Sequence, residues 1–369
     1  MKKAVLLTVS GEIPPDIVKQ IADGRRPRAD YLELARSLDA DLIDYGKARR
    51  STGRAGRFFE RIGGANLMLA YACWKIRRQY QAIATDGEQV GIPLAALLKL
   101  TPGKSPCHLM IVHDISAAKK LPFLDWLRVH SHIDRFFVYS RWQKRFIKQR
   151  WNMACERVTW TPFMVDQQFF SPAQVMPKTA SRPQICAVGL ERRDYPTLMR
   201  AVEGLDLDVV VAAASPWSKY KDSTSGQRVP QNVTVKKFSQ HDLRQLYADS
   251  LFLVMPLEEV NFQAGVTAIL EAMAMAKPVI CSRAPGQTDV ITENENGRYV
   301  DCDDPAALRA AIVSLVAERE EIARMGANGR RLIEDEMNLD RYAERFAAVT
   351  RACVLDRTFD SRAKVVKRS

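Results

Sequence analysis

The stretch NFQAGVTAILEAMAMAKPVI, which begins at Asn261, combines a glycine-containing turn with a helical pattern. The apolar run LFLVMP precedes it and is typical of a buried strand. A helix that starts at such a turn has backbone N–H groups without helical partners, and its dipole adds positive potential at that end. Gly265, Val266 and Thr267 therefore have the character of a phosphate-binding turn, with the Thr267 hydroxyl as a further donor.

Glu271 follows Thr267 by four residues and so lies one helical turn deeper on the same face. A carboxylate at that position is suited to accept hydrogen bonds from the paired hydroxyls of a ribose. An ordinary helix glutamate with a solvated head has the same spacing, so the position alone leaves both interpretations open.

A second apolar run ends at a glycine and is followed by basic residues. The segment ICAVGLERRDYPTLMRAV, from Ile185, reaches Gly189 and then places Arg192 and Arg193 at the start of a helical pattern. Further along, the loop that contains Phe238 and Ser239 precedes a predicted helix and is a candidate for contacting a nucleotide base.

In the first half of the chain, polar residues also follow directly after apolar runs. His113 can hydrogen-bond a sugar or a phosphate, with Asp114 fixing its tautomer, or it can be satisfied by neighbouring backbone. Asp86 and Glu88, in ATDGEQVG, can orient an acceptor hydroxyl or cap the next helix.

Short β-branched runs alternate with helical stretches along almost the whole chain of 369 residues. That alternation predicts parallel sheets covered by helices on both faces. The proline-rich stretch after Ser171 interrupts it, and a second series of strands and helices begins near Ile185. We therefore expect an α/β protein with two tandem Rossmann-like doubly wound domains facing each other across a cleft. The expected boundaries are 1–172, a linker at 173–183, a second domain at 184–345, and a helix with a basic tail at 346–369.

The net positive charge of the chain comes from its first half. The formal net charge is +12, and residues 1–178 hold 29 Lys and Arg against 16 Asp and Glu. An anionic partner for that half, such as a membrane surface or a phosphate-bearing substrate, is one explanation, and a merely solvated basic face is the other. No known nucleic-acid-reading motif occurs, so we expect no nucleic-acid partner.

Cysteine and histidine spacing argues against metal and disulfide scaffolds. The seven cysteines include no CxxC pair, and His108, His130 and His132 lack metal-ligand spacing. We expect reduced core cysteines, no bound metal and a cytoplasmic location. No apolar run of membrane-spanning length occurs in the sequence.

Taken together, these segments resemble the retaining glycosyltransferases of family 4, which have the GT-B fold. In that family a glutamate, seven residues, and a second glutamate before Ala-Met-Ala and a Lys-Pro strand mark the nucleotide-sugar site. The chain matches from Glu271 through Ile280, and GQTDVITENENGRYVDCDDPAAL follows as the family's usual continuation. TPFMVDQQFFSP, IVHDIS and FFVYSRWQKRF resemble other family segments. The resemblance covers most of the chain and is strongest over residues 185–345.

The chain departs from the family at Gln263, where the family has its first glutamate. Glutamine keeps a carbonyl acceptor, gains an amide donor and loses the negative charge. Three interpretations follow: an altered sugar preference, a role transferred to Glu258 or Glu259, or a transferase with little activity. We favour the altered preference because Arg192, Arg193 and Glu271 are all present.

The resemblance implies transfer of a hexose from a nucleotide-diphosphate sugar with retention of configuration and without a metal. It implies catalytic roles for His113, Arg192, Arg193, Gln263 and Glu271. The acceptor is then a hydroxyl of a glycan, a lipid-linked or a small molecule, in cell-envelope or polysaccharide biosynthesis. Basic residues beside Phe58 and Phe59 suit an anionic membrane surface on the cytoplasmic side. A non-catalytic binder of sugar nucleotides with the same fold is the first alternative, and a basic nucleic-acid-binding protein is the second and less favoured one.

Overall fold

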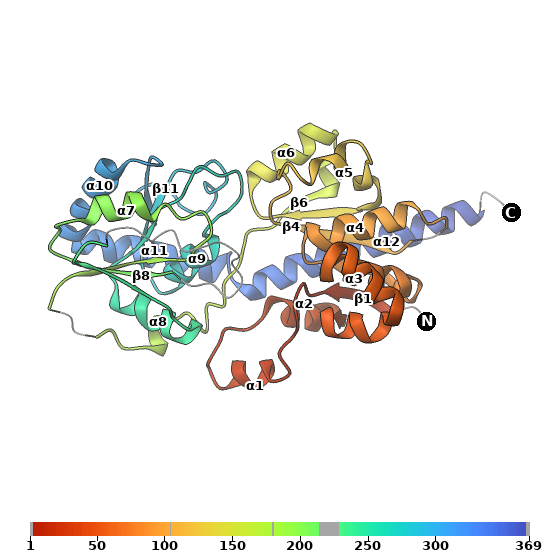
Figure 1. Ribbon diagram of the computed structural model, residues 1–369, viewed down its shortest axis with the longest axis horizontal. Helices are drawn as coiled ribbons and strands as arrows, with labels where there is room; N and C mark the ends of the chain where they lie inside the picture. Colours follow the sequence, from red (N-terminus) through yellow and green to blue (C-terminus); the bar gives the residue numbers. More distant parts are fainter. Residues whose placement is uncertain (1–2, 104, 179–180, 214–228, 367–369) are drawn as a thin grey trace. The chain divides into compact units, whose positions relative to one another are not determined.

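The computed structural model describes residues 3–103, 105–178, 181–213 and 229–366, which form two compact units (Figure 1). Each unit contains a parallel sheet of six strands. The first unit comprises Met1–Ile17, Ala29–Pro162 and Asp340–Ser369, and the second comprises Val18–Arg28 and Phe163–Leu339. The predicted pair of doubly wound α/β domains is thereby confirmed.

In the first unit the strand order is β2-β1-β3-β4-β5-β6. The strands are β1 (Lys3–Thr8), β2 (Asp41–Ile43), β3 (Tyr80–Thr85), β4 (Cys107–Val112), β5 (Arg135–Val138) and β6 (Val158–Trp160). The helices are α2 (Asp30–Leu38), α3 (Tyr45–Ile76), α4 (Glu88–Lys99), α5 (Leu121–Asp125), α6 (Arg141–Trp151) and α12 (Leu339–Val366), with 3-10 turns η1 (Arg77–Gln79), η2 (Val129–His132) and η3 (Cys155–Arg157). The chain order reverses between the neighbours β1 and β3, so the loops that follow these two strands meet at one place.

In the second unit the strand order is β12-β11-β10-β7-β8-β9. The strands are β7 (Gln184–Val188), β8 (Asp208–Ala212), β9 (Val233–Lys236), β10 (Leu253–Met255), β11 (Val279–Ser282) and β12 (Gly297–Val300). The helices are α7 (Tyr195–Val202), α8 (Gln240–Asp249), α9 (Val266–Ala274), α10 (Pro305–Ala317) and α11 (Arg319–Asp335), with the 3-10 turn η4 (Pro172–Gln174). The short helix α1 (Ile17–Ala22) lies where the chain passes between the units.

The side chains of β7 show how helices cover both faces of this sheet. Ile185 and Ala187 pack in the same apolar core as the buried residues of α7 and α10. Cys186 and Val188 point to the opposite face and pack with α9. Successive strand residues point to opposite faces, so a strand buried on both faces is a continuous apolar run, as the sequence indicated.

The units differ from the expected boundaries at both ends of the chain. Arg28 donates to Asp166 from its backbone N at 2.8 Å and from Nε at 3.1 Å, which fixes residues 18–28 to the second unit. From Asp340 onward, α12 belongs to the first unit rather than to a separate tail. Residues 179–180 of the expected linker and residues 367–369 of the expected tail lie outside the described residues.

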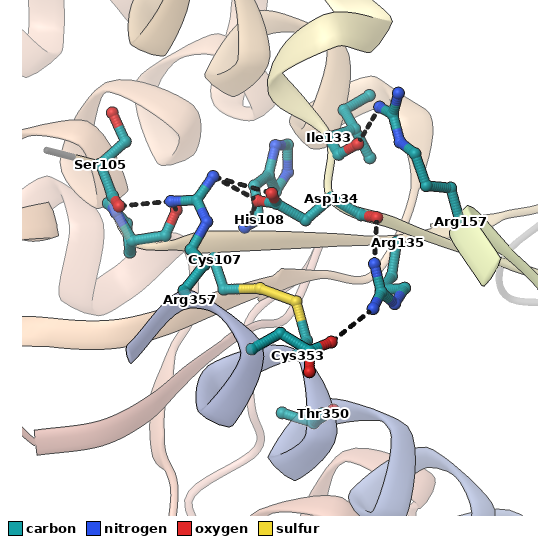
Figure 2. The surroundings of a disulfide bond; sticks show 12 residues. Ser105, Cys107, His108, Ile133, Asp134, Arg135, Arg157, Thr350, Cys353 and Arg357 are labelled. Carbon is teal, nitrogen blue, oxygen red and sulfur yellow. Dashed lines mark hydrogen bonds and ion pairs between the residues drawn. A yellow bond between two sulfur atoms is a disulfide. The ribbon is translucent and has the colours of Figure 1, made fainter. Parts of the chain in front are cut away.

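A disulfide joins α12 to the first sheet. Cys353 bonds to Cys107 at the start of β4, across a sequence separation of 246 residues (Figure 2). Phe346 stacks on Phe137 with ring centroids 4.1 Å apart, and so α12 packs along the sheet. The expectation that all cysteines are reduced is wrong for this pair, because the return of α12 to β4 is not visible in cysteine spacing. Cys155 is exposed, so it is not a core residue either.

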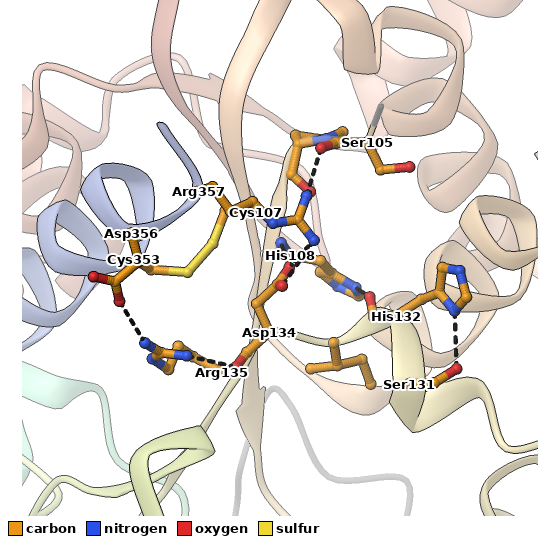
Figure 3. A network of polar contacts seen from close by, with 12 residues as sticks. Ser105, Cys107, His108, Ser131, His132, Asp134, Arg135, Cys353, Asp356 and Arg357 are labelled. Carbon is orange, nitrogen blue, oxygen red and sulfur yellow. Dashed lines mark hydrogen bonds and ion pairs between the residues drawn. A yellow bond between two sulfur atoms is a disulfide. The ribbon is translucent and has the colours of Figure 1, made fainter. Parts of the chain in front are cut away.

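Polar contacts beside the disulfide hold the same helix (Figure 3). Arg357 donates from Nη2 to both carboxylate oxygens of Asp134, at 2.7 and 2.9 Å. The backbone N of His108 also donates to Asp134, at 2.7 Å, and its ring Nδ1 lies 3.0 Å from the His132 carbonyl. Burial lowers the pKa of His108 to about 4, which keeps the ring neutral and structural.

Helix α3 begins at Tyr45 and continues across non-helical conformations at Gly53 and Gly64. Across the described helices, none has both the length and the apolar character that a membrane crossing needs.

Candidate functional site

The loops after β7 and β10 lie side by side in the second unit, because these two strands are neighbours and the chain order reverses between them. Ligands of doubly wound sheets bind at this position, outside the carboxyl ends of the strands. Backbone contacts join the two loops: Asp194 N donates to the Pro256 carbonyl at 3.0 Å, and Glu258 N donates to the Arg192 carbonyl at 3.1 Å.

Arg193 is the buried cation of this site. Its Nε donates to the Val188 carbonyl at 3.0 Å and its Nη1 to the Glu191 carbonyl at 2.6 Å, so the backbone fixes the guanidinium. A Cβ on Gly189 would lie 2.4 Å from Nη2 of Arg193, and one on Gly265 would lie 3.2 Å from it. Both glycines have positive φ, at 106° and 77°. The guanidinium therefore sits against two turns that only glycine accommodates.

Arg192 has a different environment from its neighbour. Its backbone is left-handed, with φ at 56°, and its side chain is partly exposed. Nη1 forms an ion pair with Oε2 of Glu258 at 3.0 Å. Glu258 is one of the two residues to which the role of the family's first glutamate could be transferred. Its carboxylate is paired with Arg192.

Helix α9 begins at this site without a side-chain cap. Its N-cap is Gly265, and the Thr267 side chain in the first turn is exposed. An uncapped helix start leaves amide donors and the positive end of the helix dipole beside the guanidinium. The sequence prediction of a strand, a glycine turn and a helix is confirmed at this point.

Gln263 lies in the loop just before α9 and has an unsatisfied amide. Both its Oε1 and its Nε2 are buried and have no hydrogen-bond partner among the described residues. An unpaired buried amide is costly, so such a group calls for a missing partner. Nearby, Gln287 donates to the Ala264 carbonyl at 3.2 Å while its own Oε1 has no partner in the described chain. No sequence pattern marks Gln287 as a site residue.

Glu271 is buried on α9 and accepts a 2.8 Å hydrogen bond from the Tyr247 hydroxyl at its Oε2. Burial raises the pKa of its carboxyl to about 7, and the hydrogen bond from Tyr247 acts in the opposite direction. Within the described residues, no donor reaches its Oε1. The solvated-head interpretation is therefore wrong, whereas the ribose-binding role stays a prediction.

Phe238 and Ser239, the expected base contacts, immediately precede helix α8. The Ser239 hydroxyl accepts from the backbone N of Asp242 at 3.2 Å, so it caps the helix. Phe238 is half-buried against the core that contains α9. Their contact with a base stays a prediction.

In the first unit, Asp86 ties together the loops after β1 and β3. Its Oδ1 accepts from the hydroxyls of Thr8 at 2.7 Å and Ser10 at 2.8 Å. Glu88 is buried and accepts from the backbone N of His113 at 2.9 Å and of Asp114 at 2.8 Å through a single oxygen. Both carboxylates thus hold loops in place, and their proposed contact with an acceptor has to compete with these bonds.

His113 projects from the end of β4 and its side chain is exposed. Its Nε2 lies 2.8 Å from the Asp86 carbonyl, which requires a proton on Nε2 and leaves Nδ1 as the acceptor of the neutral ring. The carboxylate of Asp114 accepts instead from the Ser116 hydroxyl at 2.9 Å. The prediction that Asp114 fixes the tautomer is wrong, because a backbone carbonyl does so.

Three residues near His113 were not predicted from the sequence as part of the site. The Tyr139 ring lies 5.6 Å from the His113 ring, and the Tyr139 hydroxyl is 3.2 Å from that of Tyr342 on α12. Burial raises the pKa of the Asp30 carboxyl, the hydrogen bond from Tyr31 N lowers it, and the charge of Asp86 raises it further. Asp30, Tyr139 and Tyr342 lie far apart in the chain, so no motif in the sequence brings them together.

Residues 195–332 match the family described as Glycosyl transferases group 1. A stretch of 79 residues is 33% identical to an uncharacterized glycosyltransferase of Methanocaldococcus jannaschii, covering 21% of this chain and 22% of that protein. The matched stretch thus spans about a fifth of that relative.

Solved structures share the fold over nearly the whole chain. Sucrose-phosphate synthase from Thermosynechococcus elongatus aligns with a TM-score of 0.69 at 16% identity, over 95% of this chain and 99% of that one. HepE of Anabaena in complex with UDP-glucose aligns with a TM-score of 0.68 at 11% identity, over 95% and 99%. The fold is that of GT-B glycosyltransferases, and the domain match together with it supports a transferase enzyme.

Proposed function

We propose that this protein is a retaining glycosyltransferase of family 4 that moves a hexose from a nucleotide-diphosphate sugar to a hydroxyl acceptor. The observation that carries the proposal is the position of Arg193. Its guanidinium is buried, held by two backbone carbonyls, and adjacent to the uncapped start of α9 at the switch point of the second sheet. A fixed cation beside an uncapped helix start is suited to a diphosphate.

In the proposed reaction, the acceptor hydroxyl attacks the anomeric carbon on the face from which the diphosphate leaves. The bond between that carbon and the phosphate oxygen breaks, the new glycosidic bond forms, and the departing phosphate oxygen takes the acceptor's proton. No side-chain nucleophile is needed. Arg193 and the α9 amides stabilise the negative charge that develops on the leaving group.

Gln263 and Glu271 would bind the two sugars of the donor. The unpaired amide of Gln263 offers both an acceptor and a donor to hydroxyls of the transferred hexose. Oε1 of Glu271 would accept from the ribose, while Tyr247 continues to hold Oε2. A ribose hydroxyl that donates to this carboxylate favours its charged form and therefore lowers its pKa on binding.

On the acceptor side, the exposed ring of His113 has a fixed tautomer whose Nδ1 can accept a hydrogen bond from a hydroxyl. The excess of basic residues over 1–178 favours an acceptor that carries a phosphate or is linked to a lipid at an anionic membrane. Such an acceptor would belong to cell-envelope or polysaccharide biosynthesis.

The test is a thermal-shift panel of UDP-, GDP- and ADP-sugars, followed by a transfer assay with the sugar that binds. A ligand at about 100 times its Kd stabilises the native state by about 2.7 kcal/mol. We expect one nucleotide class to raise the Tm of the wild type but not of Glu271→Ala or Arg193→Gln. Arg244→Gln is the matched control, because Arg244 is also buried and donates to a backbone carbonyl, that of Phe169, at 3.2 Å.

The outcomes separate the alternatives. Release of the sugar onto an acceptor with unchanged anomeric configuration, read by NMR, supports the retaining transferase. Tight binding without transfer to any acceptor or to water identifies a non-catalytic sugar-nucleotide binder. A panel without any shift argues against the donor site itself.

A further inference from the structure

Large apolar side chains are exposed just after the end of α4, on α5 and just after the end of α5. Leu100 is 82% exposed, Trp126 82%, Leu127 56% and Phe123 45%. The Lys99 side chain joins the two segments, because its Nζ donates to the Leu127 carbonyl at 2.6 Å. An exposed apolar cluster of this kind marks a binding surface.

A row of aromatic contacts connects this cluster with α3. The indole N–H of Trp74 donates to Thr101 Oγ1, next to Leu100, at 2.7 Å. Trp74 stacks with Tyr71 at 5.8 Å between ring centroids, and Tyr71 stacks with Phe59 at 4.3 Å. These contacts link the exposed cluster to the central part of α3 through neighbouring side chains of the first unit.

The central part of α3 carries the same combination of apolar and basic residues. Phe58 is 60% exposed and Ile62 is 61% exposed, four residues apart on one helical face between the breaks at Gly53 and Gly64. The exposed basic residues of this segment are Arg54, Arg57 and Arg61. None of these three is ion-paired with a carboxylate in the part of the chain that the structure describes.

In the described part of the chain, the exposed charges of this surface that have no opposite partner are basic. Glu60, the acidic residue of the α3 segment, is paired with Arg49, whose Nη2 lies 2.8 Å from its Oε1. Lys99 and Arg128 flank the Trp126 cluster and are exposed. Asp125, the acidic residue within it, is neutralised by Arg150, whose Nη2 lies 2.7 Å from its Oδ2. Scattered cations on long side chains, with aromatic groups between them, fit an anionic fluid surface.

We propose that this surface, defined by Leu100, Phe123, Trp126 and Leu127 together with Phe58, Ile62 and the basic residues beside them, docks on a bilayer that contains anionic lipids. Trp126 and Leu127 enter the interfacial region, where a tryptophan ring is favoured, and the arginines bind the headgroups. This inference deepens the proposed function, since it rests on a lipid-linked acceptor at the membrane, but vesicle binding can be measured without a donor or an acceptor.

The test uses the full chain and sedimentation with vesicles of phosphatidylcholine alone or with about 30% phosphatidylglycerol. We expect binding to the anionic vesicles, weakened by salt. Trp126→Ser/Leu127→Ser should weaken binding at least tenfold, and Arg57→Gln/Arg61→Gln by about 30-fold, from roughly 1 kcal/mol for each basic residue. Val313→Ser is the matched control, because Val313 is 49% exposed on α10 of the second unit and should leave binding unchanged.

A fluorescence measurement distinguishes insertion from adsorption. Brominated lipids should quench part of the tryptophan emission of the wild type, and Trp126→Phe should retain binding but lose that part of the quenching. Equal affinity for neutral vesicles, or anionic binding that Trp126→Ser/Leu127→Ser leaves intact, would overturn the proposal. So would concentration-dependent self-association that the same variant abolishes, because the surface would then be an interface between copies of the chain.

The nucleotide-sugar thermal shift provides the independent readout. If the protein does not bind vesicles but a nucleotide sugar still raises its Tm, only the membrane-docking proposal is contradicted. Vesicle binding without any donor shift contradicts the proposed transferase and leaves the membrane surface standing.

Discussion

The Tyr247 hydroxyl on α8 donates a 2.8 Å hydrogen bond to the Glu271 carboxylate on α9. Burial nevertheless raises the pKa of Glu271 to about 7, because one neutral hydrogen bond only partly offsets the lost hydration of the charge. A carboxyl that changes charge near neutral pH makes both stability and donor binding depend on pH.

The first prediction concerns stability. The folded-state pKa of Glu271 lies above its ordinary value of 4.5, so the folded protein binds this proton more tightly than the unfolded chain. The resulting stability is fully present below about pH 4.5 and is lost as pH rises through about 7. We expect Glu271→Gln to reduce the fall in unfolding free energy between pH 5 and 8.5 by about 1–3 kcal/mol. Urea titrations would measure it, with the exposed Glu203→Gln as control; identical slopes for all three proteins would contradict it.

The second prediction separates the effect of backbone strain at Gly265 from the effect of displacing the Arg193 guanidinium. Gly265→Ala forces a side chain into a left-handed turn with its Cβ 2.6 Å from Met255 Sδ and 3.2 Å from Arg193 Nη2. Gly204→Ala has a similar φ, 72°, and nothing within 4 Å of the new Cβ. Both should lose about 1 kcal/mol of stability from strain. Only Gly265→Ala should also weaken nucleotide-sugar affinity by more than about tenfold, measured by calorimetry. Equal affinities in the two variants would contradict the role of this turn.

The third prediction concerns sugar choice. A charged carboxylate in Gln263→Glu enters a buried position, so the donor-free variant should lose roughly 1–2 kcal/mol of stability. With donor bound, the charge interacts more strongly with sugar hydroxyls, and the ratio of kcat/KM values among sugars of one nucleotide should change by at least about tenfold. Gln287→Glu is the control that should lose stability without this change. An unchanged preference in Gln263→Glu would instead favour Gln263 as a structural residue.

The fourth prediction concerns the disulfide between Cys107 and Cys353. Cross-linking β4 to α12 closes a loop of 246 residues, and such bonds contribute about 2–4 kcal/mol. Dithiothreitol should lower the Tm of the wild type and leave Cys353→Ser unaffected. Cys155→Ser, which changes an exposed free thiol, should respond to dithiothreitol like the wild type. Thiol titration of the unfolded protein that finds all seven cysteines free would contradict the bond.

The fifth prediction concerns metal. If Arg193 and the α9 amides neutralise the leaving diphosphate, dialysis against EDTA should leave the transfer rate within about twofold of its starting value. Abolition by EDTA and recovery with Mg²⁺ would show that a cation shares this role.

Local sequence patterns were sufficient for the elements of the second unit. The apolar run, glycine turn and helix through Gly265 appear where the residues from Leu251 predicted them, because strand burial and helix initiation depend on nearest neighbours.

Tertiary structure decided which side chains are available for chemistry. Arg192 and Arg193 are adjacent in sequence, yet one is ion-paired at the surface and the other is buried against Gly189 and Gly265. Likewise, the tautomer of His113 depends on the Asp86 carbonyl at the end of another strand.

The amino-acid sequence alone therefore determined the two doubly wound sheets and the glycine turns, since these follow from periodicity and from local backbone preference. Only the tertiary structure decided the burial of Glu271, the bond from Cys107 to Cys353 and the exposed surface around Trp126. Each of these depends on contacts between segments far apart in the chain, and such contacts leave no periodic signal in the sequence.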